Sequence, residues 1–201
     1  MVFYTSAQSN NELEGILALQ KANLPSNLTQ EEMESQGFVT VVHSLNDLRH
    51  MNDIEPHIIA KDDDKVVAYL LAMTSASKED IAVLKPMFKI FENIQFSRKP
   101  VSSYQYIVVG QVCVDKNFRG QGVLDNCYFA YKNAFRQKYE FAITEIASRN
   151  TRSINAHKRI GFTHLHQYTA PDGEEWSIIV WKWREGETLN DRHETGQTYI
   201  S

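Results

Sequence analysis

Hydrophobic and polar positions along the chain follow two distinct periods. Short apolar or alternating runs, typical of β-strands, occupy residues 2–6, 57–60, 66–73, 104–114, 141–147, 162–170 and 175–183. Apolar residues spaced three or four apart, typical of amphipathic helices, occupy 10–21, 44–52, 77–94, 122–139 and 151–160. A further short helix starts at the capping-type sequence of Thr29 and ends at Gly37, and Phe38–Val42 follows as a brief extended piece.

The order of these elements predicts one mixed α/β domain. Polar turns at 62–65 and 171–173 join neighbouring strands as antiparallel hairpins. Residues 104–147 form one strand–helix–strand crossover, which makes its two strands parallel. We therefore expect a mainly antiparallel sheet with helices on both faces. The domain is predicted over residues 1–184, and 185–201 is predicted as a polar C-terminal tail.

Composition and charge exclude several classes of function. Of 201 residues, 42% are hydrophobic, and the net charge of -4 with a pI near 6.0 gives no basic footprint for nucleic acid. No signal peptide is visible, and no apolar stretch approaches the ~20 residues that cross a membrane. Cys113 and Cys127 are too far apart for a C-x-x-C pair, so neither a disulfide framework nor a metal site is predicted. These features predict a soluble cytoplasmic protein.

The most informative segment is V-C-V-D-K-N-F-R-G-Q-G-V-L, residues 112–124. A strand runs through a glycine turn directly into a helix, whose first N–H groups lack intrahelical partners and carry the positive end of the helix dipole. Glycine lets a phosphate approach without a Cβ in the way. The pattern matches neither a Walker loop nor G-x-G-x-x-G. The two glycines could also make nothing more than a tight connection.

A second segment, Asn150–Phe162, has the sequence N-T-R-S-I-N-A-H-K-R-I-G-F. Asn150 is a typical helix cap and Gly161 a typical helix stop. His157 lies three residues from both Ile154 and Ile160, which places it on the inward face. Taken alone, such a histidine is more often a hydrogen-bonded core residue than a catalytic one.

Together the two segments resemble the signature motifs of the GNAT superfamily of acyl-CoA-dependent N-acyltransferases. The resemblance is specific over residues 104–162 and looser, though consistent in element order, over 3–183. It implies a strongly twisted mixed sheet whose fourth and fifth strands splay apart, with acetyl-CoA wedged between them. Here the splayed pair would be Tyr106–Val114 and Phe141–Ala147.

The resemblance also assigns cofactor-binding residues. The backbone of Val112, Cys113 and Val114 would pair with the pantetheine arm of acetyl-CoA. The pyrophosphate would be held by the turn, whose matching residues are Arg119, Gly120, Gln121, Gly122 and Val123. Asn150 would contact the pantetheine amides, and Ser153 takes a small-residue position of the motif. Leu124 replaces a usual glycine or alanine, which is expected to weaken cofactor binding without abolishing it.

Catalytic roles carry over less completely. His157 falls where the family usually has a tyrosine that donates a proton to the departing thiolate, and a histidine can do the same near neutral pH. The alternative is that His157 only orients the cofactor. The backbone N–H of Val114 or its neighbour is the family's usual kind of oxyanion donor. No general base is identified, because Gln111 is neutral and the position of Glu145 is often structural in the family.

The acceptor side is less specified. Residues 24–38 occupy the place where family members line the acceptor site, and their carboxylates could attract an amine or simply be solvated. Residues 74–104 are an insertion relative to the minimal fold, with Phe88, Phe91 and Phe96 on one stripe. Packing on the sheet as ordinary core is favoured over a lid or a homodimer contact.

These observations favour an N-acetyltransferase that transfers an acetyl group from acetyl-CoA to a small-molecule primary amine, ahead of a peptide amine. A non-catalytic acyl-CoA-binding or sensor module is the alternative, because of Leu124, the missing base and the histidine replacement. A plain dinucleotide-binding domain ranks last, since the chain lacks the βαβ repetition that such a fold needs.

Overall fold

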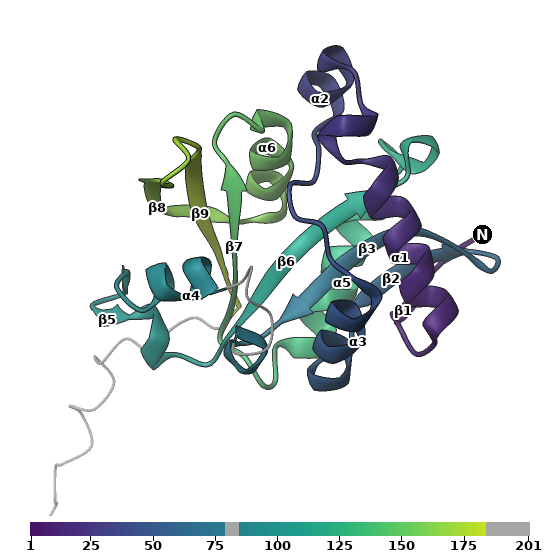
Figure 1. Ribbon diagram of the computed structural model, residues 1–201. Coiled ribbons are helices and arrows are strands. Elements are labelled where there is room, and N and C mark those ends of the chain that lie inside the picture. The colour runs from purple at the N-terminus through teal and green to yellow at the C-terminus, as the bar shows by residue number, and fades with distance from the viewer. Residues whose placement is uncertain (79–84, 184–201) are drawn as a thin grey trace, which may run out of the picture.

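Seven strands form one twisted sheet in the computed structural model, which describes residues 1–78 and 85–183 (Figure 1). The sheet order is β1-β2-β3-β6-β7-β9-β8. Its strands are β1 (Val2–Ser6), β2 (Ile58–Asp62), β3 (Lys65–Met73), β6 (Tyr106–Val114), β7 (Phe141–Ala147), β8 (Thr163–Thr169) and β9 (Glu175–Lys182). The α-helices are α1 (Asn10–Ala22), α2 (Gln30–Gln36), α3 (Leu45–Ile54), α4 (Lys85–Phe91), α5 (Val123–Phe135) and α6 (Thr151–Ile160). The predicted mixed fold is confirmed.

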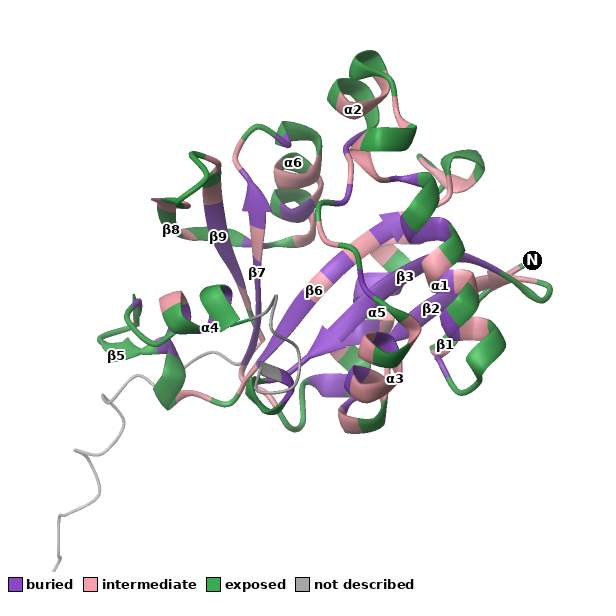
Figure 2. Cartoon of the chain, in the orientation of Figure 1, coloured by how far each residue is buried: buried purple, intermediate pink, exposed green. Residues whose placement is uncertain are grey.

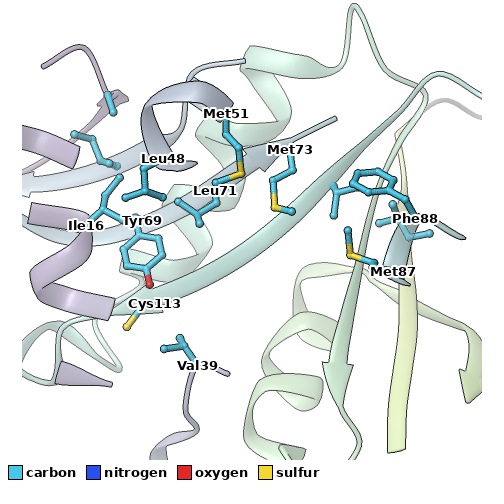
Figure 3. Close-up of a cluster of buried hydrophobic side chains, with 14 of the residues drawn as sticks. Ile16, Val39, Leu48, Met51, Tyr69, Leu71, Met73, Met87, Phe88 and Cys113 are labelled. Carbon is cyan, nitrogen blue, oxygen red and sulfur yellow. The ribbon is translucent and has the colours of Figure 1, made fainter. Parts of the chain in front are cut away.

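Helices cover both faces of the sheet, so its central strands are buried (Figure 2). On one face, residues of α1, α3 and α4 pack on alternate side chains of β3, β6 and β7, including Tyr69 and Leu71 (Figure 3). On the other face, Tyr128 and Tyr131 of α5 pack on the intervening side chains. The two faces alternate because successive strand residues point to opposite sides.

The parallel pair β6–β7 separates after a short contact, as the sequence predicted. Backbone pairing covers only Tyr106–Val108 against Phe141–Ile143, and one bond from the hydroxyl of Thr144 to the carbonyl of Val109 (2.7 Å) extends it. At this point β6 carries a bulge opposite β3, at Gly110. A Cβ on Gly110 would lie 1.6 Å from the sulfur of Met73, so a larger residue would force the Met73 side chain to move. The bulge bends β6 away from β7 and opens the sheet.

The insertion between β3 and β6 packs mainly as core. Phe88 and Phe91 are buried on the sheet beside Tyr106. Ser77, the first residue of the helix predicted over 77–94, instead lies within a 3-10 helix (Ser75–Lys78), and α4 begins at Lys85. Residues 79–84 of the predicted helix lie outside the described residues. Pro86 is tolerated because it falls in the first turn of α4, where its missing N–H has no partner to lose.

Other boundaries differ modestly from those predicted. Strands β4 (Gln95–Phe96) and β5 (Lys99–Pro100) form a small separate hairpin that the sequence pattern did not show. The helix predicted to reach residue 139 ends at Phe135. Within the described ranges, no helix is long and apolar enough to span a membrane. The predicted tail, residues 185–201, lies outside the described part of the chain.

Candidate active site

A cavity of about 570 Å³ opens between the C-terminal end of β6 and α6. Its walls come from the end of β6, the turn before α5, the first turn of α5, most of α6, and the segment that follows α2. Predicted cofactor residues among its lining are Val112, Cys113, Val114, Arg119, Gly120, Gly122, Val123, Asn150 and Ser153. The structure therefore brings the two sequence motifs together around one space. Its size is in the range typical of small-molecule and cofactor sites.

The turn before α5 has the geometry of an anion site. Gly122 is the N-cap of α5 in the left-handed region (φ 77°), and Gly120 also has a positive φ (73°), which non-glycine residues rarely adopt. No atom lies within 4 Å of the position that a Cβ on Gly120 would occupy. The first N–H groups of α5 are free of intrahelical bonds and face this open space. Leu124 lines the cavity and leaves these N–H groups in place.

Two predicted turn residues use their side chains elsewhere. The amide of Gln121 donates to the carbonyl of Asn117 (2.7 Å), so only the backbone of Gln121 belongs to the turn. The guanidinium of Arg119 donates to the carbonyl of Val114 (2.9 Å), to Asn23 (2.6 Å) and to Gln36. Arg119 thus fastens the α1–α2 segment to the end of β6. The sequence motif gave no signal for this tether, because its partners are 96 and 83 residues away.

Asn150 caps α6 and also holds the segment after α2. Its Oδ1 accepts from the N–H of Ser153 (3.2 Å), as the sequence predicted for a cap. Its Nδ2 donates to the carbonyl of Phe38 (3.1 Å), which lies 112 residues away. Asn150 is buried between the two partners.

His157 is buried among aromatic side chains, and both its ring nitrogens have partners. Nδ1 lies 2.8 Å from the carbonyl of Ser153, so it carries the proton and donates to that oxygen. Nε2 then accepts from the hydroxyl of Tyr128 at 2.6 Å. Burial lowers the pKa of His157 to about 4. The hydrogen bond to the carbonyl of Ser153 raises the pKa, but by less than burial lowers it. The imidazole is therefore neutral at pH 7.

A second, smaller cavity of about 60 Å³ adjoins the first in the gap between β6 and β7. The two cavities share wall residues, namely Phe38, Val39, Val112, Asn150, Ser153 and His157. The smaller one is also lined by Gln111, Glu145 and Trp176. Among the described residues that line it, Glu145 is the only acidic one. A group in this cavity is therefore next to both the large cavity and a carboxylate.

Glu145 has the titration behaviour of a group that works near neutral pH. Desolvation raises its pKa to about 6, although the hydroxyl of Tyr168, which donates to Oε2 at 2.7 Å, acts in the opposite direction. Burial and this carboxylate together raise the pKa of Tyr168, so the phenol stays protonated and keeps donating. The carboxylate is thus ionised above pH 6 and poorly solvated, which favours proton uptake.

Gln111 has a positioning role at the floor of the smaller cavity. Its Oε1 accepts from the buried hydroxyl of Tyr69 (2.5 Å), and its Nε2 donates to the carbonyl of Val41 (2.8 Å). Gln111 therefore orients the segment that passes in front of β6. The sequence singled out Gln111 only as a neutral residue on the key strand.

The cysteines are buried thiols. Cys113 lines the large cavity, and burial raises its pKa to about 12 in spite of the neighbouring Arg119. Burial also raises the pKa of Cys127, on α5, to about 12. Because the thiolate is the nucleophilic form of cysteine, neither side chain is activated for attack on an acyl group. Among the described residues, no group of three or more His, Cys, Asp and Glu side chains could hold a metal ion.

Comparisons with known proteins agree with this geometry. The family model described as Acetyltransferase (GNAT) family matches residues 22–162. No curated protein sequence matches the chain. Among solved structures, a polyamine N-acetyltransferase of Drosophila melanogaster superposes with a TM-score of 0.65 at 12% identity, covering 91% of this chain and 100% of the other.

Two bacterial structures are similar at the same level. The ribosomal-protein-S18-alanine N-acetyltransferase of Escherichia coli has a TM-score of 0.60 at 12% identity and covers 94% of this chain and 99% of its own. yncA of Salmonella typhimurium, a putative acetyltransferase solved with acetyl-CoA, has a TM-score of 0.60 at 12% identity, with 95% and 99% covered. At such identities the structures show the shared fold alone. The family model spans more than half of the chain, and the chain therefore belongs to the GNAT family of acetyltransferases.

Proposed function

We propose that this protein transfers an acetyl group from acetyl-CoA to a primary amine by direct attack of the amine. The observation that carries the proposal is the shared wall of the two cavities. The large one offers an anion-binding turn, and the small one places a carboxylate of raised pKa beside it. A thioester and an amine that enter from these two sides meet between β6 and β7.

The residues of the large cavity fit the cofactor. The free N–H groups at the start of α5 match a pyrophosphate, and Arg152 adds positive charge to the lining, whereas Arg159 is paired with Asp125. Beyond Val109, the edge of β6 that faces β7 has no strand partner, so its backbone groups are available to the amides of a pantetheine arm. Bound acetyl-CoA would supply an acetyl group activated as a thioester.

Direct attack is supported over an acyl-enzyme route. The one cysteine that lines the cofactor cavity, Cys113, is a thiol with a pKa of about 12. At pH 7 such a group is almost entirely protonated, and its nucleophilicity is lost. The amine itself is then the nucleophile, and it needs a group to take its proton.

Glu145 is our candidate for that group. It lines the smaller cavity, and with a pKa of about 6 it is ionised at pH 7 yet readily protonated. A general base works best when its pKa lies near the operating pH. Tyr168, which donates to the carboxylate at 2.7 Å, keeps its orientation fixed. The sequence pattern left the base open, and the environment of Glu145 supplies the argument.

The surroundings of His157 argue against its predicted role as proton donor. Neither nitrogen has a free N–H for a thiolate, because Nδ1 donates to Ser153 and Nε2 accepts from Tyr128. A pKa of about 4 leaves almost no imidazolium at neutral pH. We therefore propose that His157 shapes the wall between the two cavities and holds the start of α6 in place. A thiolate leaving group, with an ordinary pKa of about 8.5, needs no strong acid.

The experiment is calorimetric titration of the full chain with acetyl-CoA, with CoA and ATP as controls, followed by a screen of amines for thiol release. One-to-one binding is expected, weakened more than 100-fold by Gly122→Glu. This change places a carboxylate among the anion-binding N–H groups and removes a glycine at positive φ. Gly173→Glu is the matched control, since Gly173 also has a positive φ (88°) but lies in the β8–β9 turn.

The outcomes separate the alternatives. Binding with thiol release that depends on an amine supports the proposal. A folded protein that binds acetyl-CoA but releases no thiol, whichever amine is offered, would be a sensor module. Equal loss of binding in the two glycine variants would mean that the turn before α5 is not the phosphate site. The preference for a small-molecule amine, the cytoplasmic location and the homodimer stay predictions from the sequence.

A further inference from the structure

The segment Phe38–His43, here called the front segment, runs in extended form between α2 and α3 (Figure 1). Its side chains alternate, with Val39 and His43 buried while Thr40 and Val42 are exposed. A period of two in burial is that of a β-strand. The same alternation then applies to its backbone groups, which point to opposite edges at successive residues.

One edge of the front segment is tied to the protein at each of its three residues. The N–H of Val39 donates to the carbonyl of Asn23 (3.1 Å), and the carbonyl of Val41 accepts from Gln111 (2.8 Å). The backbone of His43 exchanges two bonds with the side chain of Gln20, at 3.1 and 3.4 Å. These partners belong to α1 and β6, so this edge faces the N-terminal half of the sheet.

The opposite edge is free where it passes the small cavity. The carbonyl of Phe38 is held by Asn150 at 3.1 Å. Within residues 1–78 and 85–183, the N–H and carbonyl groups of Thr40 and Val42 have no hydrogen-bond partner. Thr40 lines the small cavity together with Glu145, whereas Val42 lies beyond the lining of that cavity. The free edge therefore starts at the small cavity, beside the carboxylate, and continues from there toward α3.

Two free residues on one edge of an extended segment present two donors and two acceptors in the spacing of a β-ladder. The group that matches this pattern is another extended backbone, as in recognition by strand addition. A polyamine would leave these amides unmatched. Its second ammonium would also find no second carboxylate in the small cavity, where Glu145 is the only acid.

The geometry points to a peptide as the acceptor. We infer that its first residues pair with Thr40 and Val42 along the free edge of the front segment, while its N-terminal α-amine lies in the small cavity beside Glu145. The peptide chain would run in the same direction as the front segment, toward α3. This inference rests on the proposed acetyl transfer, and it replaces the small-molecule amine that the sequence favoured.

The chemistry of the amine agrees with this assignment. An α-amine has a pKa of about 7.7–8.0, whereas a lysine side chain has a pKa of about 10.4. The pKa of Glu145, about 6, is therefore much closer to the pKa of an α-amine than to that of a lysine side chain, so the proton passes to Glu145 more easily from an α-amine. The small volume of the cavity, about 60 Å³, admits the terminus of a chain and leaves the rest of the peptide on the front segment.

The test compares acceptors of increasing length. For each of a set of amino acids X, kcat/KM is measured for the amide X-NH2 and for the tripeptide amide X-Ala-Ala-NH2, by thiol release from acetyl-CoA. Each backbone hydrogen bond gained is expected to raise kcat/KM about fivefold. Two such bonds predict that the tripeptide exceeds the single amino-acid amide about 25-fold for the accepted X.

Proline variants then locate the edge. Val42→Pro removes an N–H from the free edge, and it is expected to lower the tripeptide kcat/KM about fivefold while leaving X-NH2 unchanged. Val42→Ala is the matched control, since it shortens the same exposed side chain and keeps the backbone N–H. N-methylation of the peptide bonds of X-Ala-Ala-NH2 makes the same test on the unaltered protein, should a variant fail to fold.

The results separate this inference from the proposed function. Equal kcat/KM for X-NH2 and the tripeptides, with turnover observed, would overturn the peptide assignment alone. Equal losses in Val42→Ala and Val42→Pro, with N-methylated peptides still good acceptors, would do the same. If no amine and no peptide causes thiol release, the proposed acetyl transfer is overturned, and the peptide assignment with it.

Discussion

Replacing Glu145 with glutamine removes the charge of the proposed base and leaves its shape. The amide oxygen of a glutamine can still accept the hydrogen bond that Tyr168 now gives to Glu145 at 2.7 Å. The neighbours of the side chain in the small cavity also stay as they are. The substitution therefore tests proton transfer with little disturbance of packing.

The magnitude follows from the role and from the pKa. Loss of a positioned general base lowers the rate about 10²- to 10⁴-fold. With a pKa of about 6, Glu145 is half ionised at pH 6 and about one tenth ionised at pH 5. The ratio of wild-type to variant kcat/KM is therefore expected to rise between pH 5 and 7 and to level off above. The ionisation of the amine cancels in this ratio.

The assay is thiol release at subsaturating amine from pH 5 to 8, for wild type and Glu145→Gln. Glu175→Gln serves as control, because it makes the same change at an exposed carboxylate of β9. A ratio that does not vary with pH would refute the assignment of Glu145 as base. So would a loss below tenfold at pH 7.5, or an equal loss in the control.

The same variant has a stability signature. The folded state raises the pKa of Glu145 from 4.5 to about 6, so it binds more protons than the unfolded chain between these values. The stabilising effect of the protonated form is fully present below pH 4.5 and is lost as pH rises through 6. Glu145→Gln is therefore expected to raise the free energy of unfolding by up to about 2 kcal/mol at pH 7.5, and to change it little at pH 4. Urea unfolding at the two pH values measures both.

Two further predictions concern the scaffold of the site. Gly110→Ala should lower the free energy of unfolding by about 1–3 kcal/mol, because its Cβ would lie 1.6 Å from the sulfur of Met73. Combined with Met73→Ala, it should show less than the sum of the two losses in urea unfolding, and strict additivity would contradict the contact. NMR titration should show depressed pKa values for His57 (about 3) and His157 (about 4), so stability falls as pH drops below 6.5. A His157 value near 7 would restore its predicted role as proton donor.

Local features of the fold were predictable because they depend on neighbours in sequence. Thr29 and Glu32 form the expected capping box of α2. Asn150 and Gly161 bound α6 as expected, with Gly161 at a φ of 117°. Each rests on hydrogen bonds or dihedral angles within a few residues. The glycine turn before α5 belongs to the same class, since Gly120 and Gly122 take their conformation from one short strand-to-helix connection.

Positions that depend on distant partners were less predictable. The pattern of α4 was predicted to start at Ser77, whereas tertiary packing places Ser77 in a separate 3-10 helix. The motif assigned Arg119 to the cofactor, but its side chain binds Asn23 and Gln36, which no local pattern links to it. Residue type alone cannot indicate which partner a long polar side chain will reach.

The sequence by itself determined the family, the order of the strands and helices, and the two motifs that meet at the cofactor cavity. It also indicated that Phe38–Val42 is extended. Only the tertiary structure decided that Glu145 titrates near pH 6, that both nitrogens of His157 are occupied, and that one edge of the front segment stays free. The physical reason is that pKa values and hydrogen-bond satisfaction depend on burial and on groups brought together from far apart in the chain. Helix caps and strand periods are set by residues that are adjacent from the start.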